Sequence, residues 1–154
     1  MGFHFDLANE LDVKKLTRIS IDAFHTDFIV AGRKTKGGPP GYDSTEFHEQ
    51  MIKDSFRFYK ILLDDSTIGG FWFNKESSEK AFLYRIFVDP KFHNMGVGSL
   101  VFDFLFQHFP NFKSWSLKTP IWNTRTSKFY VKLGFEITEK TDKFLFFTKR
   151  MESK

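Results

Sequence analysis

The sequence predicts an α/β or α+β domain with a mixed sheet, and three observations lead to that fold class. In some segments apolar residues alternate as in strands, and in others they recur at helical spacing. The two kinds of segment are interspersed along the chain, as expected for a sheet covered by helices. The chain has 154 residues, 41% hydrophobic and 27% charged, which fits one globular domain over residues 1–154.

The first elements are predicted to be a strand and a helix. Phe3, Phe5 and Leu7 alternate with polar neighbours, which predicts a strand. Asn9 can cap the helix, because its side-chain oxygen can accept a hydrogen bond from a free N–H group of the first turn. The apolar residues at roughly helical spacing after it are Leu11, Leu16, Ile19, Ile21 and Ala23.

A loop, a second helix and a hairpin are expected next. The stretch from Gly32 to Ser44 breaks all periodicity and predicts the loop, whose last residues, Asp43 or Ser44, can cap a helix over 45–54. The run from Phe56 to Leu63 is apolar on nearly both faces, which predicts a strand covered on both sides. Residues 67–74 are its hairpin partner, in which Gly69-Gly70 permits a bulge or a close approach.

The remaining pattern completes the element order. It predicts a strand over 81–88, a helix over 97–109, a strand over 113–119, a helix over 123–133 that stops at Gly134, and a final hairpin of 135–137 with 144–148. The whole order is β-α-α-β-β-β-α-β-α-β-β.

Composition narrows the possible functions. The 22 Phe residues alternate within strand-like runs or fill a helix-like run, which predicts a core of large rings more readily than a surface that stacks bases. The absence of Cys excludes disulfides, thiolate metal sites and a Cys nucleophile in this chain. The five His residues show no metal-binding spacing, so we predict no metal.

Charge and hydropathy indicate the partners. The net charge is +4, but Lys and Arg are scattered and accompany no DNA-reading motif, so we expect no nucleic-acid partner. No apolar run approaches the ~20 residues that a membrane span needs, and the N-terminal residues do not read as a leader. We therefore expect a cytoplasmic protein that does not bind membranes.

Gly96 and Gly98 lie where the helix over 97–109 should begin. Bare N–H groups at a helix N-terminus, with the positive end of the helix dipole behind them, bind phosphate or pyrophosphate. The same two glycines also suit an ordinary tight turn. A Walker loop is excluded because no glycine stands in the GxxxxGK[ST] frame, and the dinucleotide motif fails because position 101 is Val.

Two separated motifs carry a family resemblance. The segment from Ile86 to Gly98, IFVDPKFHNMGVG, resembles the acetyl-CoA signature of the GNAT superfamily of N-acetyltransferases, whose loop reads [Gln/Arg]-x-x-Gly-x-[Gly/Ala]. Asn123, seven residues before the Tyr130 of FYVKLGF, is similar to the second signature of that family. His93 stands where the family usually has Gln or Arg, which puts a side-chain contact to the pyrophosphate in question.

This resemblance implies a GNAT-like fold and acetyl-CoA as co-substrate. The mostly antiparallel sheet would have about seven strands, splay apart in the middle to admit the thioester, and carry about four helices. The pantetheine arm would pair with backbone groups near the end of the strand over 81–88, and the pyrophosphate would rest on the loop amides. The implied cofactor-binding residues are Ile86, Phe87, Val88, His93, Asn94, Met95, Gly96, Val97, Gly98, Ser99 and Asn123.

The resemblance also implies the chemistry. Tyr130 takes the place of the family's general acid, which protonates the CoA thiolate; its alternative is a Tyr packed between helix and sheet. Asn123 would bind the cofactor or a nearby water, and it can also be a helix N-cap. Trp72 and Trp122 could line the opening of the sheet but fit core or rim packing better.

The acceptor is expected to be a small-molecule amine rather than a ribosomal protein. Lys118 stands where some peptide N-terminal acetyltransferases of the family have Glu. The loop over 32–44 would bind the acceptor through Tyr42 and Asp43; the alternative is a mobile surface loop. Three residues, Asp43, Glu46 and His48, or a chain of waters, remain candidates for the general base.

Two further possibilities concern the whole chain. A non-catalytic acyl-CoA-binding or regulatory module on the same fold is the alternative function, because His93 and the missing Glu both depart from the family pattern. A homodimer is possible through the exposed edge of the hairpin over 135–147.

Overall fold

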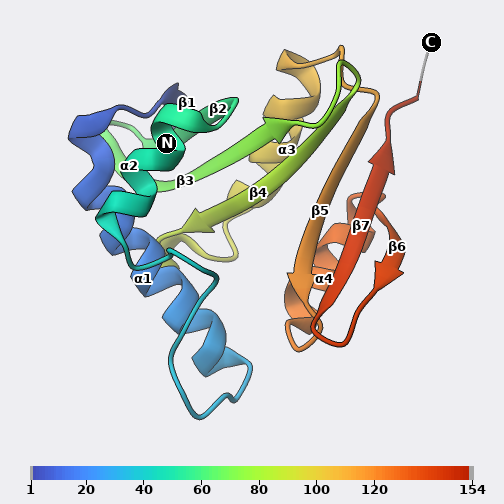
Figure 1. The fold of residues 1–154 in the computed structure, drawn as a ribbon. Coiled ribbons are helices and arrows are strands. Elements are labelled where there is room, and N and C mark those ends of the chain that lie inside the picture. Colours follow the sequence, from blue (N-terminus) through green and yellow to red (C-terminus); the bar gives the residue numbers. More distant parts are fainter. Residues whose placement is uncertain (1, 153–154) are drawn as a thin grey trace. The chain divides into compact units, whose positions relative to one another are not determined.

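The computed structural model describes residues 2–152, which form seven strands and four helices (Figure 1). In chain order these are β1 (Phe3–Leu7), α1 (Val13–Val30), α2 (Thr45–Asp54), β2 (Arg57–Leu63), β3 (Ser66–Lys75), β4 (Lys80–Val88), α3 (Val97–His108), β5 (Ser114–Pro120), α4 (Thr124–Lys132), β6 (Glu136–Lys140) and β7 (Phe144–Arg150). Short 3-10 turns cover Glu10–Asp12 and Pro90–Phe92. The predicted element order is confirmed.

The strands form one mixed sheet in the order β1-β2-β3-β4-β5-β7-β6. The pairs β1–β2, β2–β3, β5–β7 and β6–β7 are antiparallel, whereas β4 and β5 are parallel. That parallel ladder joins only Lys80–Phe82 to Ser114–Ser116. The predicted fold class, a mixed and mostly antiparallel sheet of seven strands with four helices, is therefore confirmed.

The chain divides into two compact units. Unit 1 holds the described residues up to Phe73 together with Arg85–Val97, and unit 2 holds Asn74–Tyr84 together with the described residues from Gly98 onward. Strand β4 therefore begins in unit 2 and ends in unit 1. Each unit has its own core.

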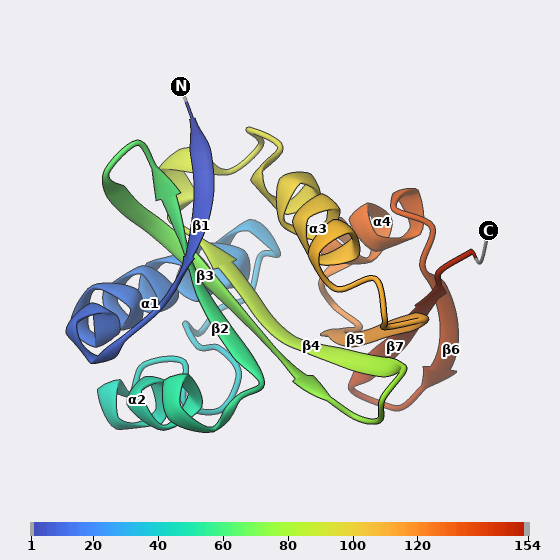
Figure 2. The same cartoon turned by 90° about the horizontal axis from the view of Figure 1, so that it is seen from above.

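In unit 1, helices α1 and α2 cover one face of the strands β1 to β3 (Figure 2). The buried residues of this layer are Leu16, Ile19 and Ala23 from α1 together with Phe58, Trp72 and Phe87 from the strands. The rings of Phe58 and Trp72 stack with centroids 5.0 Å apart. Offset-stacked rings bury much apolar area, so this cross-strand pair anchors α1 on the sheet.

In unit 2, helices α3 and α4 lie side by side against one face of the β5, β7 and β6 strands (Figure 2). Phe102 of α3 is fully buried and meets Phe135 edge-on, with ring centroids 5.5 Å apart. Phe147 of β7 and Trp115 of β5 are buried on the same layer. The predicted core of large aromatic rings is confirmed in both units.

Strand β3 carries a bulge next to its glycine pair. Ile61 pairs with Gly69 and Leu62 with Thr67, so Ile68 is the additional residue. A Cβ on Gly69 would stand 2.3 Å from the backbone oxygen of Phe87 in β4. Both expectations for Gly69-Gly70, a bulge and a close approach, are confirmed, because only a residue without a side chain lets the β4 backbone come so near.

One expectation for the first helix is wrong. Leu11 is 89% exposed, not packed on the apolar face. It lies in the 3-10 turn Glu10–Asp12, where Asn9 accepts from the Leu11 N–H and the Asp12 carboxylate accepts from the Asn9 N–H. Since the α-helix begins only at Val13, the helical spacing does not extend back to Leu11.

Among the described residues, no helix combines the length and the apolar character that crossing a membrane requires.

Candidate functional site

The loop between β4 and α3 has an unusual backbone. The φ angle is −64° at His93, 65° at Asn94 and 77° at Gly96, with negative values at the residues between and after them. Within residues 2–152, the N–H groups of Asn94 to Val97 make no hydrogen bond. Successive residues of alternating conformation point their N–H groups into one concavity, which binds anions. The loop leads directly into the N-terminus of α3, whose dipole adds positive potential.

The side chain of His93 forms a hydrogen bond that holds this loop against the end of β4. Its Nε2 lies 2.8 Å from the carbonyl oxygen of Val88, the last residue of β4. A carbonyl oxygen can only accept, so Nε2 carries a proton and donates it. The ring therefore ties the loop to the end of the strand. A direct contact from His93 to the cofactor stays a prediction.

Gly96 and Gly98 are glycines for different reasons. Gly96 has a left-handed backbone, and a Cβ there would meet nothing within 4 Å. Gly98 is not left-handed, but a Cβ there would stand 2.9 Å from the ring of Phe129 on α4. The first turn of α3 thus rests against α4 because Gly98 lacks a side chain, a reason that the phosphate-site interpretation does not include.

Gly96→Ala tests the loop, with Gly32→Ala as a matched control. Gly32 is also left-handed, at a φ of 75°, and also has open space around a Cβ. Both substitutions should therefore destabilise the fold by a similar amount, roughly 1–2 kcal/mol. Only Gly96→Ala should weaken CoA, by about tenfold, because charge-assisted hydrogen bonds contribute about 1.5–3 kcal/mol each. Calorimetry would measure both affinities, and equal affinity in the two variants would contradict an anion site at this loop.

At the end of β4, main-chain groups are better placed than side chains to contact a cofactor. Phe87 is buried, and its ring belongs to the core of unit 1. The N–H of Asp89 donates to the carbonyl of Ile68 at 2.7 Å, which continues the pairing with β3 past Val88. The predicted cofactor contacts of Ile86, Phe87 and Val88 would therefore come from their main chain and stay predictions.

Asn123 caps helix α4, which confirms the N-cap interpretation. Its side-chain oxygen accepts from the N–H of Thr126 at 3.3 Å, and the residue is only 8% exposed. The Thr126 hydroxyl bonds to the Asn123 carbonyl at 3.0 Å and pairs with the Thr119 hydroxyl at 2.7 Å. The cap is thereby joined to β5. A cofactor contact of Asn123 stays a prediction.

Two substitutions separate the cap from a cofactor contact. Asn123→Ala should lower stability by about 0.5–2 kcal/mol through loss of the cap, whereas Asn123→Ser should restore most of it. If Asn123 also contacts CoA, both variants should bind CoA more weakly, because a Ser side chain is shorter than Asn and has no amide N–H. Thermal melting would measure the change in stability and calorimetry the change in CoA affinity. If Asn123→Ser binds CoA as tightly as the wild type, Asn123 serves only as the helix cap.

Tyr130 lies seven residues beyond Asn123 on the same helix and is 8% exposed. Its ring contacts those of Phe102 at 6.1 Å, Phe135 at 6.0 Å and Phe147 at 5.6 Å between centroids, as well as that of the adjacent Phe129. The packed position of Tyr130 is confirmed. Its role as the general acid stays a prediction. Gly98, Ser99, Asn123 and Tyr130 all belong to unit 2.

The loop before α2 is anchored at Tyr42. The Tyr42 hydroxyl lies 2.9 Å from Nε2 of His25, and its carbonyl accepts from the Ser20 hydroxyl at 2.8 Å. Burial and the neighbouring Asp43 carboxylate raise the pKa of Tyr42. The side chain of Asp43 is exposed. Tyr42 and Asp43 thus lie in unit 1 beside α1, and their contact with an acceptor stays a prediction.

Of the three side chains considered as a base, only His48 is buried. It is 0% exposed, whereas Asp43 and Glu46 are exposed. Its Nδ1 lies 2.8 Å from the Ser44 carbonyl, so Nδ1 carries the proton, and Nε2 is an unprotonated acceptor. Burial lowers the pKa of His48, the bond to Ser44 raises it, and the nearby Arg85 charge lowers it. His48 is therefore a neutral imidazole in the core of unit 1.

The sequence interpretation missed Arg85. It lies within the apolar run of β4, and its guanidinium contacts the rings of Phe47 and Trp72. A charged residue between Tyr84 and Ile86 in such a run was the available signal. Trp72 itself is 2% exposed, which confirms its place in the core.

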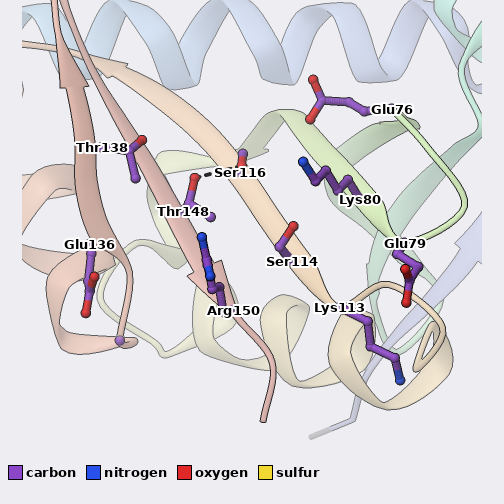
Figure 3. Close-up of a pocket in the computed structure, with 11 residues that line it drawn as sticks. Glu76, Glu79, Lys80, Lys113, Ser114, Ser116, Glu136, Thr138, Thr148 and Arg150 are labelled. Carbon is purple, nitrogen blue, oxygen red and sulfur yellow. Dashed lines mark hydrogen bonds between the residues drawn. The ribbon is translucent and has the colours of Figure 1, made fainter. Parts of the chain in front are cut away.

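A wide concave surface in unit 2 contains none of the predicted site residues (Figure 3). Its volume is about 870 Å³, and it is lined by polar side chains of β4 to β7, among them Lys80, Glu136 and Arg150. Ser116 and Thr148 bond to each other across it at 2.9 Å. Among residues 2–152, no group of three or more His, Asp or Glu side chains is placed to hold a metal ion.

Comparison with known proteins supports the fold described above. Solved structures with the same fold include the PaiA N-acetyltransferase of Thermoplasma acidophilum in complex with coenzyme A, at 16% identity and a TM-score of 0.80 over 97% of this chain and 99% of that one. An acetyltransferase of Thermus thermophilus matches at 12% identity and a TM-score of 0.81, with 98% of both chains covered. Ard1 of Thermoplasma volcanium matches at 19% identity and a TM-score of 0.72, with 99% of this chain and 100% of that one covered.

No curated protein matches the sequence. The family model of the acetyltransferase (GNAT) family matches residues 21–135, which include the loop before α3, Asn123 and Tyr130. The chain therefore belongs to the GNAT acetyltransferase family, whose members transfer acyl groups from acyl-CoA.

Proposed function

We propose that this protein transfers an acetyl group directly from acetyl-CoA to a primary amine of a small-molecule acceptor. The observation that carries the proposal is the row of unbonded N–H groups from Asn94 to Val97 ahead of α3. A pyrophosphate is the CoA group that such a concavity fits. The chain has no Cys to carry an acyl intermediate, which favours direct transfer.

The cofactor would be held mainly by backbone. The pyrophosphate accepts hydrogen bonds from the amides between Asn94 and Ser99, while the pantetheine arm pairs with main-chain groups of Ile86 to Val88. His93 supports the site by fixing the loop to Val88. This arrangement explains how the loop can work without the Gln or Arg that is usual at its first position.

Tyr130 acts as the acid in this proposal. The neutral amine attacks the thioester carbonyl, the carbon–sulfur bond breaks, and the phenol gives its proton to the leaving thiolate. An ordinary Tyr has a pKa of about 10, which suits protonation of a thiolate. The attacking nitrogen loses one of its two protons to a base or to water and keeps the other in the amide, and a proton taken up from solvent restores the Tyr130 phenol.

The acceptor is proposed to be small. Lys118 lies where a catalytic Glu would favour peptide N-termini, and its Nζ stands 4.5 Å from the centre of the Phe144 ring. Tyr42 and Asp43, at the end of the loop that precedes α2, are the proposed acceptor contacts.

A thiol-release assay tests the proposal. Acetyl-CoA would be mixed with the protein and a panel of amino acids, polyamines, aminoglycosides and peptides, after calorimetry has established CoA binding. Acceptor-dependent release of CoA thiol with at least one small amine is the expected result. Tight CoA binding without turnover of any acceptor would instead favour a non-catalytic acyl-CoA-binding module.

A further inference from the structure

Arg85 is a half-buried cation without an anionic partner. Its Cζ lies 5.0 Å from the centre of the Phe47 ring and 5.1 Å from that of Trp72. Nη2 donates to the carbonyl oxygen of Pro40, whereas Nη1 is buried and has no hydrogen-bond partner. Within residues 2–152, no carboxylate forms an ion pair with it. The guanidinium thus has one neutral acceptor and one unused, buried edge.

Removing a guanidinium from water without an anionic partner destabilises the folded state. Burial lowers the pKa of Arg85 to about 10, so the group remains charged at neutral pH but is less well solvated than in water. Replacing a buried charge by an apolar residue of similar size is often neutral or stabilising. Retaining the charge is therefore better explained by a ligand than by packing.

A second unsatisfied group lies against the same two rings. The His48 imidazole meets Phe47 at 5.7 Å and Trp72 at 6.3 Å between centroids. Its Nε2 is buried without a partner and, as shown above, carries no proton. Arg85 thus has a free donor and His48 a free acceptor, both on side chains that contact the rings of Phe47 and Trp72 in unit 1.

The chain that covers Arg85 belongs to the loop before α2. Pro40 is exposed, although its carbonyl oxygen faces the guanidinium. That oxygen takes the position that one oxygen of a carboxylate would take in a two-point Arg–carboxylate pair. The neighbouring Tyr42 is a proposed acceptor contact, and it belongs to the same loop as Pro40.

We propose that Arg85 binds a carboxylate of the acceptor, and that the acceptor is therefore an amino acid or another small amine that carries a carboxylate. The carboxylate pairs with Nη1 and Nη2 and displaces the Pro40 carbonyl, and His48 accepts a hydrogen bond from an N–H or O–H of the same molecule. A carboxylate fits better than a phosphate, because His48 is neutral and Arg85 supplies a single positive charge. The identification of this ligand as the acceptor rests on the proposed function; the binding of a carboxylate does not.

Binding of matched ligand pairs tests this inference. Each L-amino acid would be compared with its amide, which keeps the amine but removes the carboxylate, by calorimetry with and without saturating CoA. We expect at least one acid to bind about tenfold or more tightly than its amide, because a charge-assisted pair contributes at least about 1.5 kcal/mol. Absence of any acid–amide difference would overturn the proposal, as would equal binding of inorganic phosphate.

Substitutions then locate the site. Arg85→Met should abolish the acid–amide difference without changing affinity for the amide or for CoA, and Arg85→Lys should retain part of it. Arg57→Met is the matched control, since Arg57 also lies over a ring, that of Phe56, and donates to a carbonyl, but it is exposed. An acid–amide difference that survives Arg85→Met would overturn the proposal.

Stability and turnover complete the test. Arg85→Met should melt at the wild-type temperature or above, and a marked fall would mean that the guanidinium serves the fold instead. Carboxylate binding through Arg85 without thiol release would reject the proposed acetyl transfer and keep the carboxylate site. Turnover of amines that lack a carboxylate, with a KM that Arg85→Met leaves unchanged, would keep the proposed acetyl transfer and reject the carboxylate site.

Discussion

Replacing Tyr130 by Phe should lower kcat by about 10²–10⁴-fold, the range that a positioned general acid contributes. The substitution removes only the hydroxyl, and a Phe ring can keep the contacts with Phe102, Phe135 and Phe147. Stability and CoA affinity should therefore remain near those of the wild type. Thiol release under saturating acetyl-CoA and acceptor measures the effect.

The matched control is Tyr84→Phe, which removes a hydroxyl from a residue that is 51% exposed on β4. Its kcat should be unchanged. A loss of less than about threefold in Tyr130→Phe would leave Tyr130 a packing residue and remove the acid from the mechanism, since even a modest general acid contributes about 10²-fold.

Gly69→Ala should have the largest effect on stability. The new Cβ would stand 2.3 Å from the Phe87 carbonyl oxygen and 3.1 Å from the Val88 Cα, and both of these are backbone atoms. A strand cannot move aside as a side chain can, so we expect a loss at the upper end of over-packing, about 2–3 kcal/mol. The corresponding fall in melting temperature is about 5–10 °C. CoA affinity should fall as well, because the arm of the cofactor is proposed to pair along this part of β4.

Its neighbour provides the comparison. A Cβ on Gly70 would meet only side-chain atoms of Phe87, Leu16 and Phe58, at 3.0 to 3.3 Å. These atoms can shift by a few tenths of an ångström, so Gly70→Ala should cost clearly less than Gly69→Ala. Equal melting temperatures for the two variants would show that the β4 backbone is free to move away from β3.

The element order was predictable because local signals mark the ends of most elements. Ser44 caps α2, and Gly134 ends α4 with a φ of 95°, so both helices begin and end close to the predicted residues. The failure at Leu11 has a local cause too. Asn9 and Asp12 form a capping box around a 3-10 turn, and spacing alone does not separate such a turn from the first turn of a helix.

The candidate site was predictable only in part. Asn123 and Tyr130 were found through a family pattern, whereas their contacts with Thr126 and Phe147 come from packing. The need for glycine at position 98 depends on Phe129, which is far along the chain and approaches only because α3 and α4 pack together.

The surroundings of Arg85 were even harder to predict from the sequence. A single charge in an apolar run can point to solvent, to an ion pair or to a ligand, and the sequence does not choose among these. The choice depends on Phe47, Trp72 and Pro40, which three separate segments bring around the guanidinium. Such a constellation emerges from tertiary packing and has no motif of its own.

The interleaving of the two compact units has a consequence for synthesis on the ribosome. Unit 1 cannot close until Arg85–Val97 has emerged, yet Asn74–Tyr84, which precedes that segment, belongs to unit 2. The growing chain must therefore hold this hairpin segment unpaired with β5 until residues 114–116 are made. No single cut in the chain separates the two units, because each is built from two segments that alternate along the sequence.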